Sequence, residues 1–256
     1  MTENQNPFLT AYNTPHETTP FHLIKTEHFE PAVLVGMEEQ NREIEEIINN
    51  PETPTFTNTI VALERSGKTL DRITTVFGNL LSAETNDEMQ AIAERIMPQL
   101  TEHSNNISLN EKLFSRIKSV YESKEKESLN QEESMLLNKT YDGFIRSGAN
   151  LSDEHKERLR KLSSELSVLT LKFSQNNLKE KNSYELPLTL EQLEGLPDSA
   201  LVAYAQTAKD KGKEDYIVTL EAPSFIPFMK YCKNRELREQ LYRAYNTQCT
   251  HDNEYN

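Results

Sequence analysis

The stretch Leu151-Ser-Asp-Glu-His-Lys-Glu-Arg-Leu-Arg-Lys-Leu-Ser-Ser-Glu-Leu-Ser-Val-Leu-Thr-Leu-Lys-Phe-Ser174 decides the fold, and it runs on toward Asn182. Its large apolar residues recur at steps of three and four: Leu159, Leu162, Leu166, Leu169 and Phe173. An α-helix has about 3.6 residues per turn, so this spacing places all five on one stripe. Exposing the stripe would forfeit about 1.5–3 kcal/mol per large apolar side chain. The sequence therefore predicts that other segments pack against it.

Helices are predicted on both sides of this stretch from the same kind of spacing. Ser152 is a natural N-cap for the long helix, because its side chain can accept a hydrogen bond from a free backbone N–H. Gly67 falls near the apolar seam of its helix, which suggests a close approach of two helices, and Pro98 should kink its helix or start a new segment. Gly148 sits where a helix would end. The expected helices before Ser152 cover 27–49, 58–82, a segment beginning after Asn86, 110–121 and a segment beginning at Asn130.

After Asn182 the long helical patterns give way to shorter elements. Two short runs rich in apolar and β-branched residues, 184–188 and 216–220, are strand candidates that could pair as an antiparallel ribbon. A helix ending at Gly212 should lie between them, and helices over 223–233 and 234–250 should follow. We therefore expect an all-α, or mainly α, fold: a multi-helix bundle of long amphipathic helices with one short two-stranded β-ribbon. The expected domains are an extended N-terminal arm (1–26), a helical bundle (27–183) and a truncated region of ribbon plus helices (184–256).

Composition excludes several classes of function. The 256 residues carry 28 Lys and Arg against 41 Asp and Glu, a formal net charge of −13. Binding to nucleic acid or to an anionic membrane needs a basic surface, so neither partner is expected. No apolar run approaches the ~20 residues that span a bilayer, and the first residues lack the features of a signal peptide. Two cysteines, Cys232 and Cys249, are too few for a disulfide framework, and reduced thiols in a cytoplasmic protein are expected.

The tetrapeptide Ser66-Gly-Lys-Thr69 resembles the end of a phosphate-binding loop. The full motif needs Gly at the position of Ala62 and a strand before it. The tetrapeptide lies instead inside the predicted helical stripe of 58–82, where the backbone N–H groups are already bonded within the helix. Nucleotide binding is therefore not expected.

No catalytic, cofactor-binding or metal-binding residue is assigned from the sequence. His16-Glu17 begins like a zinc-binding H-E-x-x-H helix, but Pro20 stands where the second histidine would be. The remaining histidines lack ligand spacing: His22, His28, His103, His155 and His251. Neither cysteine has the electropositive setting of an activated thiol. The carboxylates of 38–46 are interpreted as a solvated helix face. The aromatic residues Phe225, Phe228, Tyr231, Tyr242 and Tyr245 are interpreted as core, with a peptide groove as the alternative.

Several stretches, taken together and in order, resemble the N-terminal part of the thimet-oligopeptidase family of zinc peptidases. The resemblance is strongest to its peptidyl-dipeptidase members and next to its oligopeptidase A members. The stretches that carry it are Ile24-Lys-Thr-Glu-His-Phe-Glu-Pro-Ala32, Asn50-Pro-Glu-Thr-Pro-Thr-Phe-Thr-Asn-Thr-Ile-Val-Ala-Leu-Glu-Arg-Ser-Gly67, Leu193-Glu-Gly-Leu-Pro197, Tyr216-Ile-Val-Thr-Leu220 and Asn234-Arg-Glu-Leu-Arg-Glu-Gln-Leu-Tyr-Arg-Ala-Tyr245.

The resemblance implies two helical lobes flanking a deep channel. In this family a later H-E-x-x-H helix and a downstream Glu bind zinc, and the Glu of the motif activates water. None of those positions exists in these 256 residues. The chain is thus expected to be the N-terminal, channel-wall and substrate-gating portion of a cytoplasmic zinc peptidase that removes C-terminal dipeptides from short unfolded peptides.

The chain is expected to be inactive alone, with zinc supplied by the missing C-terminal catalytic portion of the parent enzyme. A free-standing helical interaction module derived from such a peptidase is the alternative. We also expect the last helix to expose Leu237, Leu241 or neighbouring aromatic residues, and the fragment to self-associate through such surface.

Overall fold

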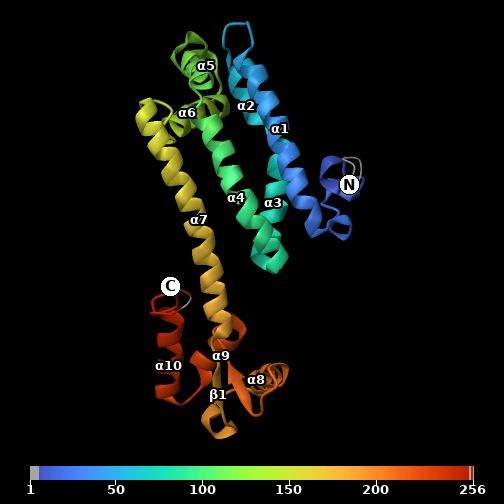
Figure 1. Ribbon diagram of the computed structural model, residues 1–256, viewed down its shortest axis with the longest axis vertical. Coiled ribbons are helices and arrows are strands. Elements are labelled where there is room, and N and C mark those ends of the chain that lie inside the picture. The colour runs from blue at the N-terminus through green and yellow to red at the C-terminus, as the bar shows by residue number, and fades with distance from the viewer. Residues whose placement is uncertain (1–5, 254, 256) are drawn as a thin grey trace. The chain divides into compact units, whose positions relative to one another are not determined.

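The computed structural model describes residues 6–253 and 255, and this part of the chain is mostly helical with one two-stranded sheet (Figure 1). The expected mainly α fold class with a short ribbon is confirmed. Residues 1–5 of the expected arm, and residues 254 and 256, lie outside the described part. The chain folds as two compact units, Met1–Leu169 and Thr170–Asn256. The domain ranges 1–26, 27–183 and 184–256 stay a prediction.

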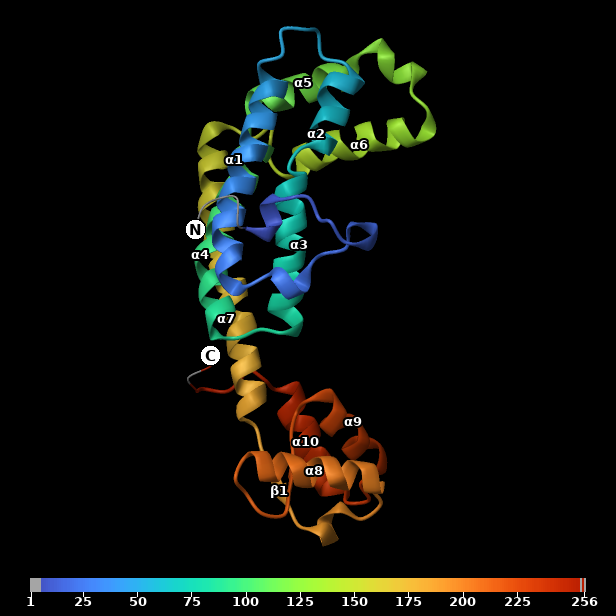
Figure 2. The ribbon, with the colours of Figure 1, turned by 90° about the vertical axis from the view of Figure 1, so that its right-hand side faces the viewer.

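The first unit is a set of antiparallel and crossing helices in which α1 packs beside α3 and α4 (Figures 1 and 2). Its helices are α1 (Phe29–Ile48), α2 (Ala62–Arg65), α3 (Lys68–Ala83), α4 (Asp87–Ser108), α5 (Glu111–Glu122), α6 (Gln131–Arg146) and the first part of α7 (Asp153–Ser183). A π-helical turn, Phe56–Val61, precedes α2, and 3₁₀ turns occupy Pro7–Leu9, Pro15–Glu17, Phe21–Leu23, Thr26–His28 and Lys124–Ser128. None of the described helices has the length and apolar character needed to cross a bilayer.

Three asparagines begin successive helices of this unit. The side-chain oxygens of Asn86, Asn110 and Asn130 each accept a hydrogen bond of 2.9–3.0 Å from the backbone N–H three residues later. Glu133 accepts a bond from the N–H of Asn130, which completes a capping box. Each cap satisfies a backbone donor that the first turn of a helix leaves free. The boundaries of α4, α5 and α6 thus follow directly from the sequence.

The prediction of one helix over 58–82 is wrong in one respect, because the helix is interrupted at Ser66 and Gly67. Ser66 leaves the helical conformation with ψ of 153°, and Gly67 adopts the left-handed conformation with φ of +70°. Only glycine enters this region without steric cost, so Gly67 allows α2 to end and α3 to begin in a new direction. Pro98, in contrast, starts no new segment, since α4 is assigned continuously through it.

The core of the first unit draws on its N-terminal segment as well as on its helices. Phe8, in the 3₁₀ turn Pro7–Leu9, is fully buried, and the centroid of its ring lies 5.0 Å from that of Phe29. Phe29 in turn contacts Phe77 on α3 at 5.1 Å. A second cluster joins α1, α5 and α6 through Ile44, Ile47, Phe56, Ile60, Leu113, Ile117, Val120 and Leu137.

The apolar stripe of α7 does not have the packing partner that the sequence analysis predicts. Leu159 is half-buried, with its Cδ2 atom 2.9 Å from the place where a Cβ on Gly148 would lie. The rest of the stripe faces solvent. The exposed fractions are 52% for Leu162, 64% for Leu166, 62% for Leu169 and 62% for Phe173. The expectation that other segments of this chain cover the stripe is therefore wrong for the described residues.

The second unit packs helices against a small antiparallel ribbon. Strand β1 (Leu186–Leu188) pairs with β2 (Tyr216–Val218), with Leu186 opposite Val218, so the predicted ribbon is confirmed. The helices are the end of α7, α8 (Asp198–Asp210), α9 (Ala222–Tyr231) and α10 (Arg235–Asn246), with a 3₁₀ turn at Leu190–Leu193. The core contains Leu186, Leu188, Leu193, Ala200, Tyr204, Val218, Leu220, Phe228, Cys232 and Leu241.

The last helix is better packed than expected. Leu241 is fully buried and Leu237 is half-buried against the core of the second unit, so the predicted exposure of these two leucines is wrong. Tyr242 and Tyr245 on the same helix are more than a third exposed, as the expectation for neighbouring aromatic residues allowed. The larger exposed apolar surface lies on α7.

Candidate functional site

A cavity of about 840 Å³ in the first unit is the strongest candidate for a binding site. It opens between α1, α2, α3, α4 and α6, and its lining includes Gln40, Ser66, Lys68, His103 and Phe144. The volume falls within the range of about 300–1,000 Å³ that ligand pockets usually occupy. The lining mixes apolar walls with a few polar groups, which is the composition of a site that binds and orients a small molecule or a short peptide.

His103 is held inside this cavity wall as a neutral group. The side chain of His103 is nearly buried, and its Nε2 atom lies 2.7 Å from Oε1 of Gln40. Since the amide oxygen can only accept, Nε2 carries the proton of this bond. Burial lowers the pKa of His103, because a charged imidazolium loses its hydration there. With its one ring proton donated to Gln40, the neutral His103 has Nδ1 as a hydrogen-bond acceptor.

The Ser66-Gly-Lys-Thr69 segment borders the same cavity, and its position corrects the sequence analysis. The segment lies at the junction of α2 and α3 rather than inside one helix. The backbone N–H of Gly67 donates a hydrogen bond of 2.7 Å to Oε2 of Glu43 on α1. A carboxylate of this chain therefore occupies the place where a phosphate would bind at a helix N-terminus. Glu43, interpreted from the sequence as part of a solvated face, is instead a cap for α3.

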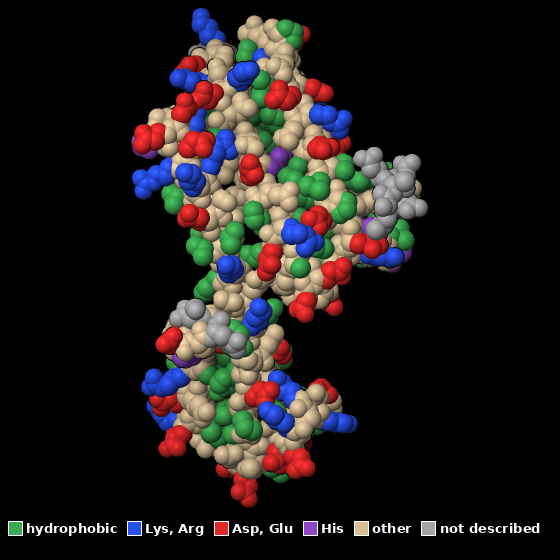
Figure 3. Space-filling model, in the orientation of Figure 1, with side chains coloured by type: hydrophobic (Ala, Val, Ile, Leu, Met, Phe, Trp, Pro, Cys, Tyr) green, Lys and Arg blue, Asp and Glu red, His purple; other side chains and the backbone are tan. Residues whose placement is uncertain are grey.

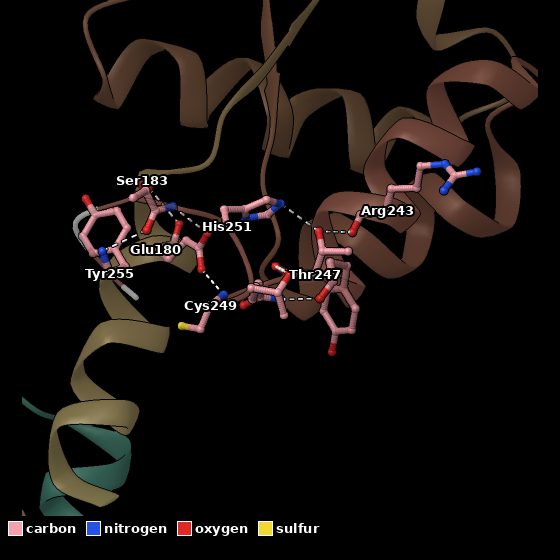
Figure 4. Close-up of polar contacts among 11 residues, drawn as sticks. Glu180, Ser183, Arg243, Thr247, Cys249, His251 and Tyr255 are labelled. Carbon is pink, nitrogen blue, oxygen red and sulfur yellow. Dashed lines mark hydrogen bonds and ion pairs between the residues drawn. The ribbon is translucent and has the colours of Figure 1, made fainter. Parts of the chain in front are cut away.

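The second unit contains a polar cluster around Glu180, near the end of α7 (Figure 4). The carboxylate accepts hydrogen bonds from the backbone N–H of Cys249, from Nδ1 of His251 at 2.9 Å and from Nδ2 of Asn253 at 3.2 Å. Nε2 of His251 lies 3.1 Å from Oγ1 of Thr247, which itself donates to the carbonyl of Arg243. The cluster ties the turn after α10 to α7.

The residue types of this cluster are those of a Cys–His–acid catalytic triad, but the geometry is different. Burial by itself raises the pKa of Glu180, but the hydrogen bonds from His251, Cys249 and Asn253 outweigh it and lower the pKa to about 2. Burial and the adjacent Glu180 carboxylate raise the pKa of the Cys249 thiol. Figure 4 shows the sulfur directed away from the His251 ring. A thiol with a raised pKa and no base is a poor nucleophile, so the cluster is a structural lock rather than an active site.

The other sequence-identified residues are dispersed. His16 and His22 are exposed, Nδ1 of His28 accepts the N–H of Lys25, and His155 lies 3.2 Å from Ser152. Cys232 is buried in the second core, where its Sγ contacts the carbonyl of Gln192 at 3.6 Å.

The structure does not bring metal ligands together within the described part of the chain. There, no three His, Cys, Asp or Glu side chains come together in a group that could hold a metal ion. The residues present therefore do not fit the zinc site that the family resemblance implies for the parent enzyme.

The aromatic residues near the C-terminus divide between core and surface. Phe228 is buried, and Phe225 stacks on Tyr245 with 4.2 Å between ring centroids. Tyr231 and Tyr242 are exposed. The core interpretation is thus confirmed for Phe228, and the stacked pair lies at the edge of the core.

Sequence reasoning missed Glu43 and Glu180 for the same reason. Their hydrogen-bond partners lie 24 and 69–73 positions away in the sequence, and no local sequence motif indicates such contacts. Both are glutamates on helices that carry several other exposed glutamates, so helical position alone does not distinguish them. The two carboxylates are structural groups that became visible only in the folded chain.

Comparison with known proteins connects the chain to peptidases. It is 34% identical over 241 residues to the dipeptidyl carboxypeptidase of Escherichia coli. This alignment covers 93% of the chain and 35% of the bacterial protein. It is 32% identical over 246 residues to oligopeptidase A of Haemophilus influenzae, with coverages of 96% and 35%. It is 32% identical over 255 residues to the organellar oligopeptidase A of Arabidopsis thaliana, with coverages of 95% and 31%. The chain spans about a third of the length of these relatives. No model of a known protein family matches it.

Proposed function

This chain is homologous to peptidases of the thimet-oligopeptidase family over about a third of their length, and from this premise we propose that it is the N-terminal, channel-wall portion of a zinc metallopeptidase. The complete enzyme removes C-terminal dipeptides from short unfolded peptides in the cytoplasm. This chain supplies part of the surface that admits such peptides and excludes folded proteins. The zinc and the water-activating glutamate belong to the remaining two thirds.

The alignment with the peptidases carries the proposal. It extends over 93–96% of the chain, and the chain contains no H-E-x-x-H sequence. The donor groups that zinc would need are not gathered in its described part either. A segment that is similar to peptidases over nearly its whole length, and whose described residues gather no metal ligands, fits a role in shaping the substrate path. The cavity beside His103 and Lys68 is the feature of this chain best suited to contact a peptide.

Reconstitution tests the proposal. The chain is co-expressed with the remaining two thirds of the E. coli dipeptidyl carboxypeptidase, and release of a dipeptide from a blocked tripeptide is measured with and without a chelator. We expect no turnover from the chain alone, with or without added zinc, and chelator-sensitive turnover from the pair. The matched control replaces the histidines of the H-E-x-x-H motif in the catalytic portion and should abolish turnover of the pair.

Two results would contradict the proposal. Chelator-sensitive hydrolysis by the isolated chain would show that it carries its own site. Equal turnover by the catalytic portion with and without this chain would show that the chain does not form part of the substrate path. A cavity variant, Lys68→Glu, should raise the KM of the reconstituted pair if peptides contact this cavity, while an exposed substitution outside it, Lys161→Glu, should not.

The exposed stripe of α7 favours a second candidate function, a helical interaction module derived from such a peptidase. Singly exposed apolar residues are ordinary, but a continuous apolar stripe on one helix usually marks a contact surface. The coding sequence distinguishes the two candidates. Continuation beyond Asn256 into an H-E-x-x-H helix supports the peptidase, and a stop codon at that point supports the module.

A further inference from the structure

The cavity of the first unit contains a hydrogen-bond acceptor that the fold leaves unused. Of the described residues that line the cavity, His103 is the only polar side chain that is more than nine-tenths buried. Its Nε2 atom donates to Gln40, and its Nδ1 atom has no hydrogen-bond partner in the described part of the chain. The unpartnered polar atoms that this part of the chain seals from solvent lie elsewhere, on Tyr12, Arg72, Arg116 and Tyr184. A ligand in the cavity can therefore reach Nδ1 of His103.

Gln40 fixes which nitrogen of His103 accepts. The amide oxygen of Gln40 takes the Nε2 proton across 2.7 Å, so the neutral ring presents an unprotonated Nδ1. The amide of Gln40 is itself held against Gly67, where an added Cβ would clash with it. Glu43, almost one turn further along α1, accepts the N–H of the same glycine. The tautomer of His103 is therefore set by the packing of α1 against Gly67 and α4.

The rest of the lining favours an uncharged ligand with an apolar body. The walls are apolar side chains: Leu63, Leu70, Leu100, Ile107 and Phe144. The charged lining residues are exposed and carry both signs: Glu64, Lys68 and Asp71. Figure 3 shows the same mixture of acidic and basic side chains over one face of the first unit. A field of one sign would be needed to attract an ion, and a carboxylate would bring only lone pairs toward Nδ1.

We propose that this cavity binds an aromatic peptide side chain that carries a hydrogen-bond donor, as tyrosine and tryptophan do, with the donor bonded to Nδ1 of His103. The ring packs against the apolar walls, and the O–H or N–H supplies the proton that Nδ1 lacks. Phenylalanine has the ring without the donor, so it leaves a nearly buried acceptor unpaired, which costs free energy. Serine and threonine have the donor without the apolar body. The volume of about 840 Å³ also leaves room for neighbouring residues of the peptide.

This inference rests on the proposed function for the peptide as the ligand, and it adds the kind of side chain that the cavity selects. All the residues that carry it belong to the first unit. Binding is therefore measured on the full 256-residue chain without the catalytic portion of a peptidase.

Two matched pairs of ligands test the hydrogen bond. The first pair is p-cresol and 4-methylanisole, which differ in whether the oxygen carries a proton. The second pair is two blocked pentapeptides that are identical except for a central tyrosine or phenylalanine. NMR titration suits the weak affinity expected of ligands this small. In each pair, the dissociation constant of the hydroxyl-bearing member should be about threefold to tenfold lower, which is the effect of one neutral hydrogen bond.

The ring nitrogens of His103 report where the ligand binds. In the free chain, a long-range proton–nitrogen spectrum should show a protonated Nε2 and an unprotonated Nδ1. Addition of p-cresol should shift the Nδ1 signal, because that atom gains a hydrogen bond. Addition of 4-methylanisole should shift it much less.

A substitution of His103 removes the acceptor. His103→Phe keeps an aromatic ring of similar size and should abolish the preference within both pairs. Circular dichroism checks that this variant is folded, since Gln40 loses its partner, and the wild-type comparison does not depend on it. His22→Phe is the matched control, because His22 is exposed and does not line the cavity, and it should keep the wild-type preference.

The outcomes separate this inference from the proposed function. Equal or absent binding within both wild-type pairs, or a preference that persists in His103→Phe, would overturn the inference. A preference for p-cresol without one for the tyrosine peptide would overturn the assignment to a peptide and leave a small phenol as the ligand. Equal binding alongside chelator-sensitive turnover of the reconstituted pair would leave the proposed function standing. A tyrosine preference without such turnover would overturn the proposed function alone.

Discussion

Oε2 of Glu43 lies 2.7 Å from the backbone nitrogen of Gly67, so a carboxylate on α1 caps the N-terminus of α3. The contact pairs the N–H of Gly67, the residue just before α3, where the chain turns between α2 and α3. It also places a negative charge at the positive end of the α3 dipole. The same junction borders the cavity that contains His103.

Removing this cap should loosen the start of α3. We expect Glu43→Ala to lower local stability by about 1 kcal/mol, the usual cost of losing a helix N-cap. Hydrogen exchange of the first-turn amides of α3 should become about fivefold faster. Glu38→Ala removes an exposed carboxylate from the same helix and should leave these rates unchanged. Equal exchange in the two variants would show that the carboxylate of Glu43 contributes nothing.

Gly67 should not tolerate a side chain. An added Cβ would clash with the side-chain amide of Gln40, and φ is +70°, a conformation that costs an L-residue about 1–2 kcal/mol. We expect Gly67→Ala to lower the free energy of unfolding of the first unit by about 1–3 kcal/mol. Because Gln40 holds His103, the variant should also change the NMR chemical shifts of the His103 ring.

Gly78 offers a matched control on the same helix. It is exposed within α3, and a Cβ there would meet no atom within 4 Å. Gly78→Ala should therefore stabilise the first unit by up to about 1 kcal/mol, since alanine is the better helix former. A thermal melt of both variants provides the comparison. Similar shifts in the same direction would contradict the assigned conformation of Gly67.

The Glu180 lock should weaken in acid. The pKa of Glu180 in the folded chain is about 2, below its ordinary value of 4.5, so the folded state favours the carboxylate. The stabilisation of the folded state by the ionised Glu180 is complete above pH 4.5 and is lost as the pH falls through 2. The size of the pKa shift sets an upper limit of about 3 kcal/mol on this stabilisation. The amide of Cys249 should exchange faster in this range, after correction for intrinsic rates. Glu180→Gln should expose the turn 247–253 at every pH and remove this pH dependence, whereas Glu165→Gln should change neither.

Tyr204 should resist ionisation until strongly alkaline pH. Burial, together with the nearby Cys232, raises the pKa of Tyr204 to about 12. Its hydroxyl donates a hydrogen bond of 2.8 Å to the carbonyl of Ser224. The folded state favours the neutral phenol, so this stabilisation is complete below pH 10 and is lost as the pH rises through 12.

Ultraviolet difference titration of wild type and Tyr204→Phe isolates this group. The difference between the two curves should rise near pH 12 rather than near 10. The variant should also lower the stability of the second unit by about 1 kcal/mol, because the Ser224 carbonyl loses its donor. Tyr242→Phe, at an exposed tyrosine, should have no effect on stability. A Tyr204 titration near pH 10 in the folded chain would contradict its burial.

Local chemistry made much of the secondary structure predictable. Asn86, Asn110 and Asn130 mark helix starts because an N-cap needs only a side chain and the N–H three residues later. The β1–β2 ribbon followed from two short apolar runs. The break at Gly67 did not, because apolar spacing continues across it and a left-handed residue adds no sequence signal other than the glycine itself.

The candidate sites depended on contacts between distant segments. The cavity beside His103 is formed by five helices, and its polar lining is assembled from residues that share no motif. The Glu180 lock joins α7 to the turn after α10, more than sixty positions away. Such pairs are chosen by packing, so a single sequence without relatives does not reveal them.

The sequence by itself determined that this chain is helical, that it carries a short antiparallel ribbon, and that its residues resemble a family of peptidases whose metal-binding motif it does not contain. These properties depend on residue spacing and on hydrogen bonds between residues close in sequence, so they can be inferred from the sequence alone. Only the tertiary structure decided which apolar faces are covered. It buried Leu241 and left Leu166 and Phe173 exposed, because burial depends on which surfaces meet in space, and the periodicity of a helix is the same in either case.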